Sequence, residues 1–189
     1  MTAAPAAGLV LAAGEGRRFG APKATVELDG ERLVDRAVRL LADGGCRPVV
    51  VVDGAVPLTV RGARVVHHED WSSGMGSSLR AGLEALRAEA TGAVVVVLVD
   101  QPWLGPESVR RLRAARAGGA FVAVATYGGQ RGNPVLLARE VWDDVAALAQ
   151  GDVGARAFMT ARPELVTSVA CDDTGRPDDV DVPEDLPGR

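Results

Sequence analysis

The first feature that could support chemistry is a glycine-rich segment near the N-terminus, in which basic residues stand among the glycines. It reads L-A-A-G-E-G-R-R-F-G-A-P-K at 11–23 and follows an apolar run at 8–13 that is expected to form a strand. Glycines let the backbone bend sharply and turn its N–H groups toward an anion. Arg17, Arg18 and Lys23 add positive charge at the same place. The segment therefore predicts a site for the phosphates of a nucleotide.

Other interpretations of this loop remain open or fit less well. A glycine-rich turn between a strand and a helix also occurs where no ligand binds. A Walker A loop ends in Gly-Lys-Ser/Thr, whereas here Gly20 is followed by Ala21-Pro22-Lys23. A Rossmann fingerprint begins its helix inside the glycine run, but Gly20 and Pro22 interrupt such a helix, and the helical pattern starts only near Leu33.

Carboxylates in two other segments could bind a metal. Asp100 directly follows the apolar strand expected at 93–99, so its side chain should be held at the carboxyl edge of the sheet. Mg²⁺ usually takes one or two protein carboxylates together with phosphate oxygens. Asp181 is the natural second ligand and Asp179 is its rival. The alternatives are a turn or N-cap aspartate at Asp100 and a solvated acidic tail around Asp181.

A second loop, W-S-S-G-M-G-S-S-L-R at 71–80, offers backbone amides and hydroxyl groups suited to a base or a ribose. The alternative is that Ser77 or Ser78 serves only as the N-cap of the following helix. His67 and His68 lack metal-ligand spacing and are interpreted as structural. The sequence shows no Ser–His–Asp, Cys–His or G-x-S-x-G pattern, so covalent nucleophilic catalysis is unsupported.

Apolar runs that alternate with helix-period segments predict an α/β fold with a mostly parallel central sheet flanked by helices. Because ligands bind at the carboxyl ends of such strands, the loops at Gly14, Trp71, Asp100 and Gly132 are expected to leave these ends and to line one cleft. A glycine-rich excursion is expected at 127–134. The expected strands are 8–13, 48–52, 64–67, 93–99, 121–126, 135–137 and 165–170, and the expected helices are 33–43, 77–89, 106–117, 138–149 and 153–160.

Composition limits the class of protein. A chain of 189 residues with 47% hydrophobic and 24% charged residues can bury a sizeable core without disulfides. The net charge of −4 argues against a nucleic-acid binder. Cys46 and Cys171 are expected to be reduced thiols, which favours a cytoplasmic protein. The apolar N-terminus carries no basic residue that would mark a signal peptide, and the run at 94–99 is too short to span a membrane.

Six blocks in one order resemble the MobA-like nucleotidyltransferases, and among them the molybdenum cofactor cytidylyltransferases. Each block alone is weak, whereas the ordered set is highly specific and covers nearly the whole chain. The blocks are the two loops already quoted, extended to 11–23 and 71–83, L-V-D-Q-P at 98–102, R-G-N-P-V-L-L at 131–137, G-D-V-G-A-R at 151–156 and D-V-D-V-P-E-D-L at 179–186. Members commonly show Arg-Gly-His-Pro where this chain has R-G-N-P, and often Asn in place of His68.

The resemblance implies a Rossmann-like nucleotidyltransferase domain over 1–189, with the acidic, Pro-rich tail at 172–189 contributing a metal-site motif. Arg18, Lys23 and Asp100 would be catalytic, and Asp100 with Asp181 would hold Mg²⁺. The nucleotide would be bound by Leu11, Ala12, Ala13, Gly14, Gly16, Arg18, Lys23, Gly74, Ser77 and Ser78. The second substrate would be bound by Arg131, Gly132, Asn133, Pro134, Gly151, Asp152 and Arg156.

The implied reaction transfers CMP from CTP to the phosphate of Mo-molybdopterin and releases pyrophosphate, with an apo molybdenum hydroxylase or its chaperone as a protein partner. Related guanylyltransferases typically read Leu-Ala-Gly-Gly where this chain reads L-A-A-G at 11–14, which favours CTP over GTP. Three alternatives stay open. They are another nucleotidyltransferase acting on a different phosphorylated acceptor, a non-catalytic carrier of the cofactor, and a dinucleotide-dependent reductase with Asp53 on a ribose.

Overall fold

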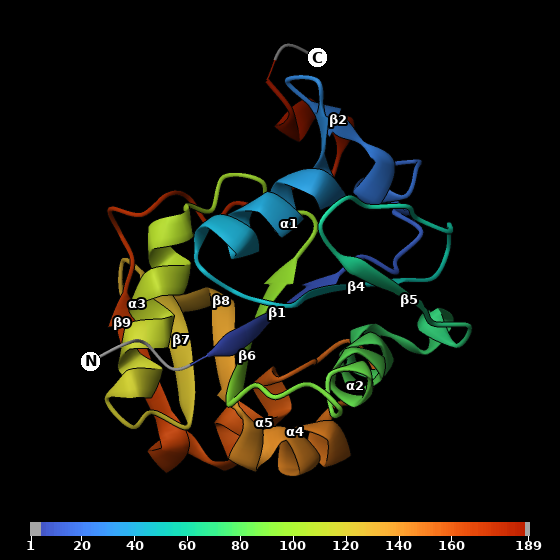
Figure 1. The fold of residues 1–189 in the computed structure, drawn as a ribbon. Coiled ribbons are helices and arrows are strands. Elements are labelled where there is room, and N and C mark those ends of the chain that lie inside the picture. The colour runs from blue at the N-terminus through green and yellow to red at the C-terminus, as the bar shows by residue number, and fades with distance from the viewer. Residues whose placement is uncertain (1–4, 188–189) are drawn as a thin grey trace.

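The computed structural model describes residues 5–187 and contains a seven-stranded sheet between two layers of helices (Figure 1). The strand order is β5-β4-β1-β6-β8-β7-β9. This arrangement confirms the predicted α/β class with a mostly parallel sheet. The strands are β1 (Ala6–Leu11), β4 (Val49–Asp53), β5 (Arg64–His67), β6 (Ala93–Leu98), β7 (Val122–Tyr127), β8 (Gln130–Ala138) and β9 (Val166–Ala170).

Helices cover both faces of the sheet, which explains why its central strand is apolar at every position. Val95 and Val97 of β6 pack into the core beneath α1 (Leu33–Asp43) and α3 (Pro106–Ala117). Val94 and Val96 point the other way, toward the helices on the opposite face. Successive residues of a strand point to opposite faces, so a strand covered on both sides needs an unbroken apolar run. The helices of that second face are α2 (Met75–Ala85), α4 (Trp142–Leu148) and α5 (Arg156–Ala161).

The glycine-rich excursion expected at 127–134 is instead the turn of a hairpin and the first part of a strand. Gly128 and Gly129 have φ values of 56° and 77° and join β7 to β8. Positive φ at both central residues is typical of the tight turn that connects antiparallel strands. β8 therefore runs antiparallel to both of its neighbours, β6 and β7. Asparagine, proline and glycine within 130–134 hid this strand from sequence reasoning, because such residues usually mark loops.

Several boundaries differ from those expected, while α1, α3 and β5 begin and end close to their predicted residues. The first strand lies two residues earlier, and α2 starts at Met75 and ends at Ala85. The helix expected at 138–149 is divided into a short 3-10 turn, η3 (Arg139–Val141), and α4, and the helix expected at 153–160 begins only at Arg156. A small hairpin was not predicted; its strands are β2 (Glu27–Leu28) and β3 (Glu31–Arg32).

The tail returns to the carboxyl edge of the sheet and is part of the core. The Val180 N–H donates to the Asp100 carbonyl at 2.8 Å, and the Arg176 N–H donates to the Trp103 carbonyl at 3.0 Å. Val180 is fully buried and Leu186 is nearly so. Apolar residues between the acidic ones thus dock the tail, so the alternative of a wholly solvated acidic tail is wrong.

Both cysteines are free and buried, as expected for reduced thiols. Burial raises the pKa of the Cys46 thiol to about 12 and also raises the pKa of Cys171. Because the thiolate is the reactive form, we expect the native protein to resist alkylation at mildly alkaline pH and the denatured protein to take up two adducts. Intact-mass measurement after iodoacetamide treatment checks this, and rapid labelling of the native protein would contradict it.

Within residues 5–187, no helix combines the length and apolarity needed to cross a membrane.

Candidate functional site

The loop after β1 is shaped by two glycines, Gly16 and Gly20, at which any other residue would be strained. Gly16 and Gly20 have φ values of 66° and 86°, in the left-handed region. The Gly20 N–H donates to the Gly16 carbonyl at 2.8 Å and closes the loop. A Cβ on Gly16 would lie 1.9 Å from the Ala21 carbonyl oxygen. After this closed turn, Lys23 begins a 3-10 helix, η1 (Lys23–Thr25), at the carboxyl edge of the sheet.

Two alanine substitutions in the loop should differ sharply in their effect on stability. Gly16→Ala combines a left-handed φ with a backbone clash, so we expect it to lower the free energy of unfolding by about 3 kcal/mol or more. A Cβ on Gly14 would meet no other atom within 4 Å, so Gly14→Ala should change that free energy by no more than about 0.5 kcal/mol. Urea unfolding of the two variants measures the difference, and equal stabilities would contradict this view of the loop.

The loop opens onto a cleft of about 460 Å³. Eleven residues predicted for the nucleotide, the metal or the second substrate line it, namely Leu11, Ala12, Ala13, Gly14, Gly16, Arg18, Lys23, Gly74, Ser78, Asp100 and Asp152. Among the other lining residues, Arg17 was expected to add positive charge to the loop, whereas no individual role was predicted for Glu15, Trp71, Ser72, Met75, Leu98 and Val99. Leu98 and Val99 could have been found from their place at the end of β6, whereas nothing in the local pattern singles out Met75.

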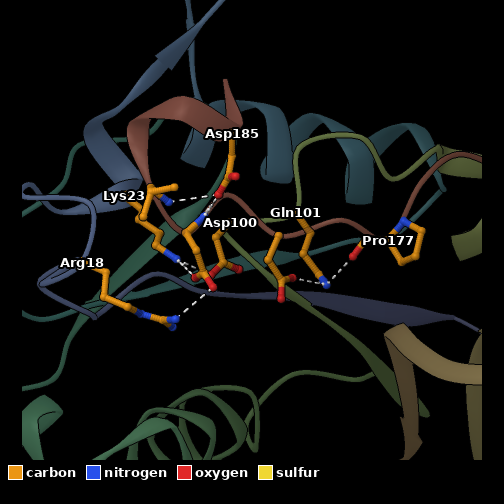
Figure 2. A network of polar contacts seen from close by, with 9 residues as sticks. Arg18, Lys23, Asp100, Gln101, Pro177 and Asp185 are labelled. Atoms are coloured by element: carbon orange, nitrogen blue, oxygen red, sulfur yellow. Dashed lines mark hydrogen bonds and ion pairs between the residues drawn. The ribbon is translucent and has the colours of Figure 1, made fainter. Parts of the chain in front are cut away.

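Opposite charges converge at one end of this cleft (Figure 2). The Lys23 Nζ lies 2.9 Å from Asp100 Oδ2 and 2.9 Å from Asp181 Oδ1. Arg18 pairs with the other Asp181 oxygen at 3.1 Å. Burial opposes the charge on Lys23, but the hydrogen bonds to Asp181 and Asp100 outweigh it and raise its pKa. The hydrogen bond from Lys23 in turn lowers the pKa of Asp181. Both partners are therefore charged at neutral pH.

The carboxylates suit a hard divalent cation. Asp100 Oδ1 is buried and has no hydrogen-bond partner among the described residues, so it is an acceptor that lacks a ligand. Residues 5–187 hold no cluster of three or more acidic, His or Cys side chains arranged as a metal cage. Mg²⁺ is usually bound by one or two protein carboxylates and keeps the rest of its shell for phosphate oxygens and water. The residues present thus fit a cation that binds together with a nucleotide.

Asp179, the alternative to Asp181 as a second metal ligand, forms a different set of contacts. The amide of Gln101 donates to Asp179 Oδ1 at 2.7 Å and to the Pro177 carbonyl at 3.1 Å. Burial, followed by repulsion from Asp100, raises the pKa of Asp179. Gln101 is itself buried, and Figure 2 shows it beside Asp100 and reaching toward Pro177. Gln101 therefore ties the tail to the edge of the sheet, and Asp179 is one of its attachment points.

The two serines of the second loop have different surroundings. Gly74, with φ 110°, turns the chain into α2, so the helix begins before Ser77 and neither serine is its N-cap. Ser78 lines the cleft. Ser77 does not; its hydroxyl donates to the Gly74 carbonyl at 2.8 Å and lies 2.8 Å from His68 Nε2. Ser77 and His68 together hold the loop, as the structural interpretation of His68 expected.

A second cavity, of about 300 Å³, adjoins the first and contains most residues predicted for the second substrate. Gly132 lies in β8 and not in a loop after a strand's carboxyl end, which corrects that expectation. Because β8 is antiparallel, its first residues still reach the same edge of the sheet. Gly151 and Pro134 do not line this cavity; the Gly151 carbonyl accepts the Gly76 N–H at 2.7 Å. The predicted residues that line it are Arg131, Gly132, Asn133, Asp152 and Arg156.

The two cavities share a wall. Leu11, Met75, Leu98 and Asp152 line both of them. One cavity carries the glycine loop, Lys23 and Asp100, while the other carries two arginines above an apolar floor. Two adjoining binding spaces of this kind can hold two substrates side by side.

Comparison with known proteins gives the family. The MobA-like NTP transferase domain matches residues 8–166, so the chain belongs to that family. It is 37% identical to nicotine blue oxidoreductase of Paenarthrobacter nicotinovorans, over 95% of this chain and 93% of that protein. It is 39% identical to a probable molybdenum cofactor guanylyltransferase of Opitutus terrae, over 52% of each chain.

A solved structure of similar shape is that of Rv0371c from Mycobacterium tuberculosis. It superimposes with a TM-score of 0.83 at 27% identity and covers 98% of this chain and 96% of that one. A second structure of Rv0371c is a complex with manganese. The fold is therefore shared along nearly the whole length of the domain.

Proposed function

We propose that the protein transfers CMP from CTP to the terminal phosphate of Mo-molybdopterin, yielding molybdopterin cytosine dinucleotide and pyrophosphate. The observation that carries this proposal is the pair of adjoining cavities with a common wall. The glycine loop, Arg18 and Lys23 suit a triphosphate, and the arginines of the second cavity suit a phosphorylated acceptor above an apolar surface for a planar ring. The relative named as a molybdenum cofactor guanylyltransferase supports the choice of acceptor.

In this reaction the residues of the chain would bind and orient the two substrates and neutralise the charge on the phosphates. An oxygen of the acceptor phosphate attacks the α-phosphorus of CTP in line; a new P–O bond forms, and the bond to the β-phosphate oxygen breaks. Mg²⁺ held by Asp100 and Asp181 would neutralise charge on the triphosphate when it is bound. Arg18 and Lys23 would contact phosphate oxygens, and Arg131 and Arg156 would hold the acceptor. Negative charge grows on the bridging oxygens, so fixed cations lower the barrier more than a nucleophile could.

The assignment of the second carboxylate favours Asp181 over Asp179. Both oxygens of Asp181 face cations of the cleft, Lys23 and Arg18. An oxygen of Asp179 is instead held by the amide of Gln101. A manganese complex of Rv0371c supports a divalent cation in a related protein. The choice of CTP over GTP rests on the L-A-A-G sequence at 11–14. We also propose that the protein is cytoplasmic.

A second candidate function is an NAD(P)H-dependent reduction, because a relative along nearly the full length is named as an oxidoreductase. Two observations favour the first candidate. Asp53, the residue that would contact a ribose, is 2% exposed, and its oxygens meet the Leu58 N–H at 2.7 Å and His67 Nδ1 at 2.8 Å. Moreover, the first α-helix after the glycines, α1, starts only at Leu33, so no α-helix begins inside the glycine run as a Rossmann fingerprint requires.

The experiment is an assay with freshly prepared Mo-molybdopterin, Mg²⁺ and each nucleoside triphosphate, in which released pyrophosphate and the dinucleotide product are both measured. We expect pyrophosphate and product in equal amounts with CTP. Turnover with GTP and with no other triphosphate would show that GTP is the donor in the same type of reaction. Tight binding of the pterin without pyrophosphate would indicate a carrier. NADPH oxidation in the presence of an aromatic dye acceptor, without nucleotide transfer, would establish the reductase instead.

A further inference from the structure

Lys23 is the only lysine in the sequence, and every other member of the 21 Lys and Arg residues is arginine. Its ammonium lies between two carboxylates, 2.9 Å from an oxygen of Asp100 and 2.9 Å from an oxygen of Asp181. An ammonium is a compact point charge on a flexible stem, whereas a guanidinium is a planar fork. The chain thus places its single compact cation where two carboxylates suited to a metal meet (Figure 2).

We propose that Lys23 is an internal cation that occupies the divalent-cation position between Asp100 and Asp181 until a nucleoside triphosphate draws it away. This inference rests on the proposed function, because it takes the two carboxylates as the metal ligands. A divalent ion bound between both carboxylates would lie close to the Lys23 ammonium, which contacts an oxygen of each, and like charges at such a separation repel strongly. Lys23 and a free divalent cation therefore compete for one position.

The surroundings of Lys23 permit this exchange. The Lys23 side chain is 15% exposed and lines the nucleotide cleft, so its stem can turn toward a bound phosphate. Its backbone stays in place, because the Val26 N–H donates to the Lys23 carbonyl at 3.1 Å and closes the short helix. Asp100 Oδ1 has no partner among the described residues, so a cation can approach that oxygen before Lys23 leaves the other. Arg18 remains paired with the far oxygen of Asp181.

The exchange couples the cation to the nucleotide. A free cation must displace both contacts of Lys23, whereas a metal–triphosphate complex supplies phosphate oxygens that accept the same hydrogen bonds. While Lys23 occupies the position in most molecules, the apparent affinity for a free cation is the intrinsic affinity multiplied by the fraction of molecules in which the position is open. Linkage then requires each ligand to strengthen the binding of the other. The substrate that this site admits is the metal–nucleotide complex.

The first test measures Mn²⁺ binding without nucleotide, by electron paramagnetic resonance, in the wild type, Lys23→Met and Lys23→Arg. We expect Lys23→Met to bind Mn²⁺ at least about tenfold more tightly than the wild type, because the competing charge is gone. Lys23→Arg keeps a charge and should stay within about threefold of the wild type. Adding Asp100→Asn should abolish the gain in Lys23→Met. Equal affinities of the wild type and Lys23→Met, or an equal gain in Lys23→Arg, would overturn the proposal.

The second test follows Lys23 in the unmodified protein. Incorporation of lysine labelled with ¹³C at Cε gives a single side-chain NMR signal, since the chain has one lysine. We expect millimolar Mg²⁺ alone to leave that signal unchanged and Mg²⁺ with CTP to shift it. A full shift with Mg²⁺ alone, or binding of CTP without a shift, would overturn the proposal. If no nucleotide binds, the proposed function is wrong about the nucleotide donor. The comparison of Mn²⁺ affinities between the wild type and the Lys23 variants would still decide the role of Lys23.

Discussion

Asp100→Asn is expected to lower the rate of nucleotide transfer about a thousandfold, which is the largest effect we expect from any single substitution in the cleft. The change keeps the shape of the side chain and removes its charge. Asp100 Oδ2 accepts the hydrogen bond of Lys23, and Oδ1 is the buried oxygen without a partner among the described residues. An amide binds Mg²⁺ poorly. The triphosphate would therefore lose its Mg²⁺ and the carboxylate that holds this ion in place.

The measurement is pyrophosphate release at saturating CTP, Mg²⁺ and acceptor. Asp143→Asn is a matched control, because Asp143 is 80% exposed on α4 and pairs with an arginine at the surface. It should keep a rate within about twofold of the wild type. An Asp100→Asn variant that retains a tenth or more of the wild-type rate would show that the metal, or the reaction itself, lies elsewhere.

Lys23→Met is expected to lower transfer about a hundredfold even though it should bind Mn²⁺ more tightly. The two expectations have one cause. Removing the ammonium frees Asp100 and Asp181 for a cation, but it also removes the charge that would contact the triphosphate as negative charge builds in the transition state. Tighter metal binding with slower turnover distinguishes this role from a simple loss of structure, which would weaken both.

Steady-state kinetics of Lys23→Met beside Arg39→Met test this expectation. Arg39 is 56% exposed and pairs with Glu31, away from the cleft, so its loss should change the rate by less than about twofold. A near-wild-type rate in Lys23→Met would remove Lys23 from the mechanism. Thermal unfolding of both variants shows whether the domain stays folded.

The residue types at the site could be predicted from the sequence, but the contacts between them could not. Local patterns place the glycine loop after one strand and Asp100 after another, and the parallel topology brings both to one edge. Nothing local shows that Lys23 meets Asp100, 77 residues away, and Asp181, 158 residues away. That contact depends on how the apolar residues of the tail dock, which is a property of the assembled core.

Predictions that rested on residue type alone were the weakest part of the sequence analysis. Ser77 and Ser78 are identical and adjacent, yet only Ser78 lines the cleft, because α2 begins at Met75 and sets which side chain faces inward. The sequence could not separate Asp179 from Asp181 as a metal ligand; in the structure Gln101 holds an oxygen of Asp179, while Lys23 contacts Asp181. Gly132 and its neighbours resemble a loop, but pairing with β6 and β7 makes them a strand, since tertiary contacts override local propensity.

The measurement that tests the central claim most directly is calorimetric binding of CTP, GTP, ATP, UTP and NADPH, each with and without Mg²⁺. A nucleotidyltransferase cleft built on Lys23, Asp100 and Asp181 predicts CTP binding that strengthens with Mg²⁺ and is lost in Asp100→Asn. Binding of NADPH that is indifferent to Mg²⁺ and to Asp100, with no binding of any triphosphate, would contradict it.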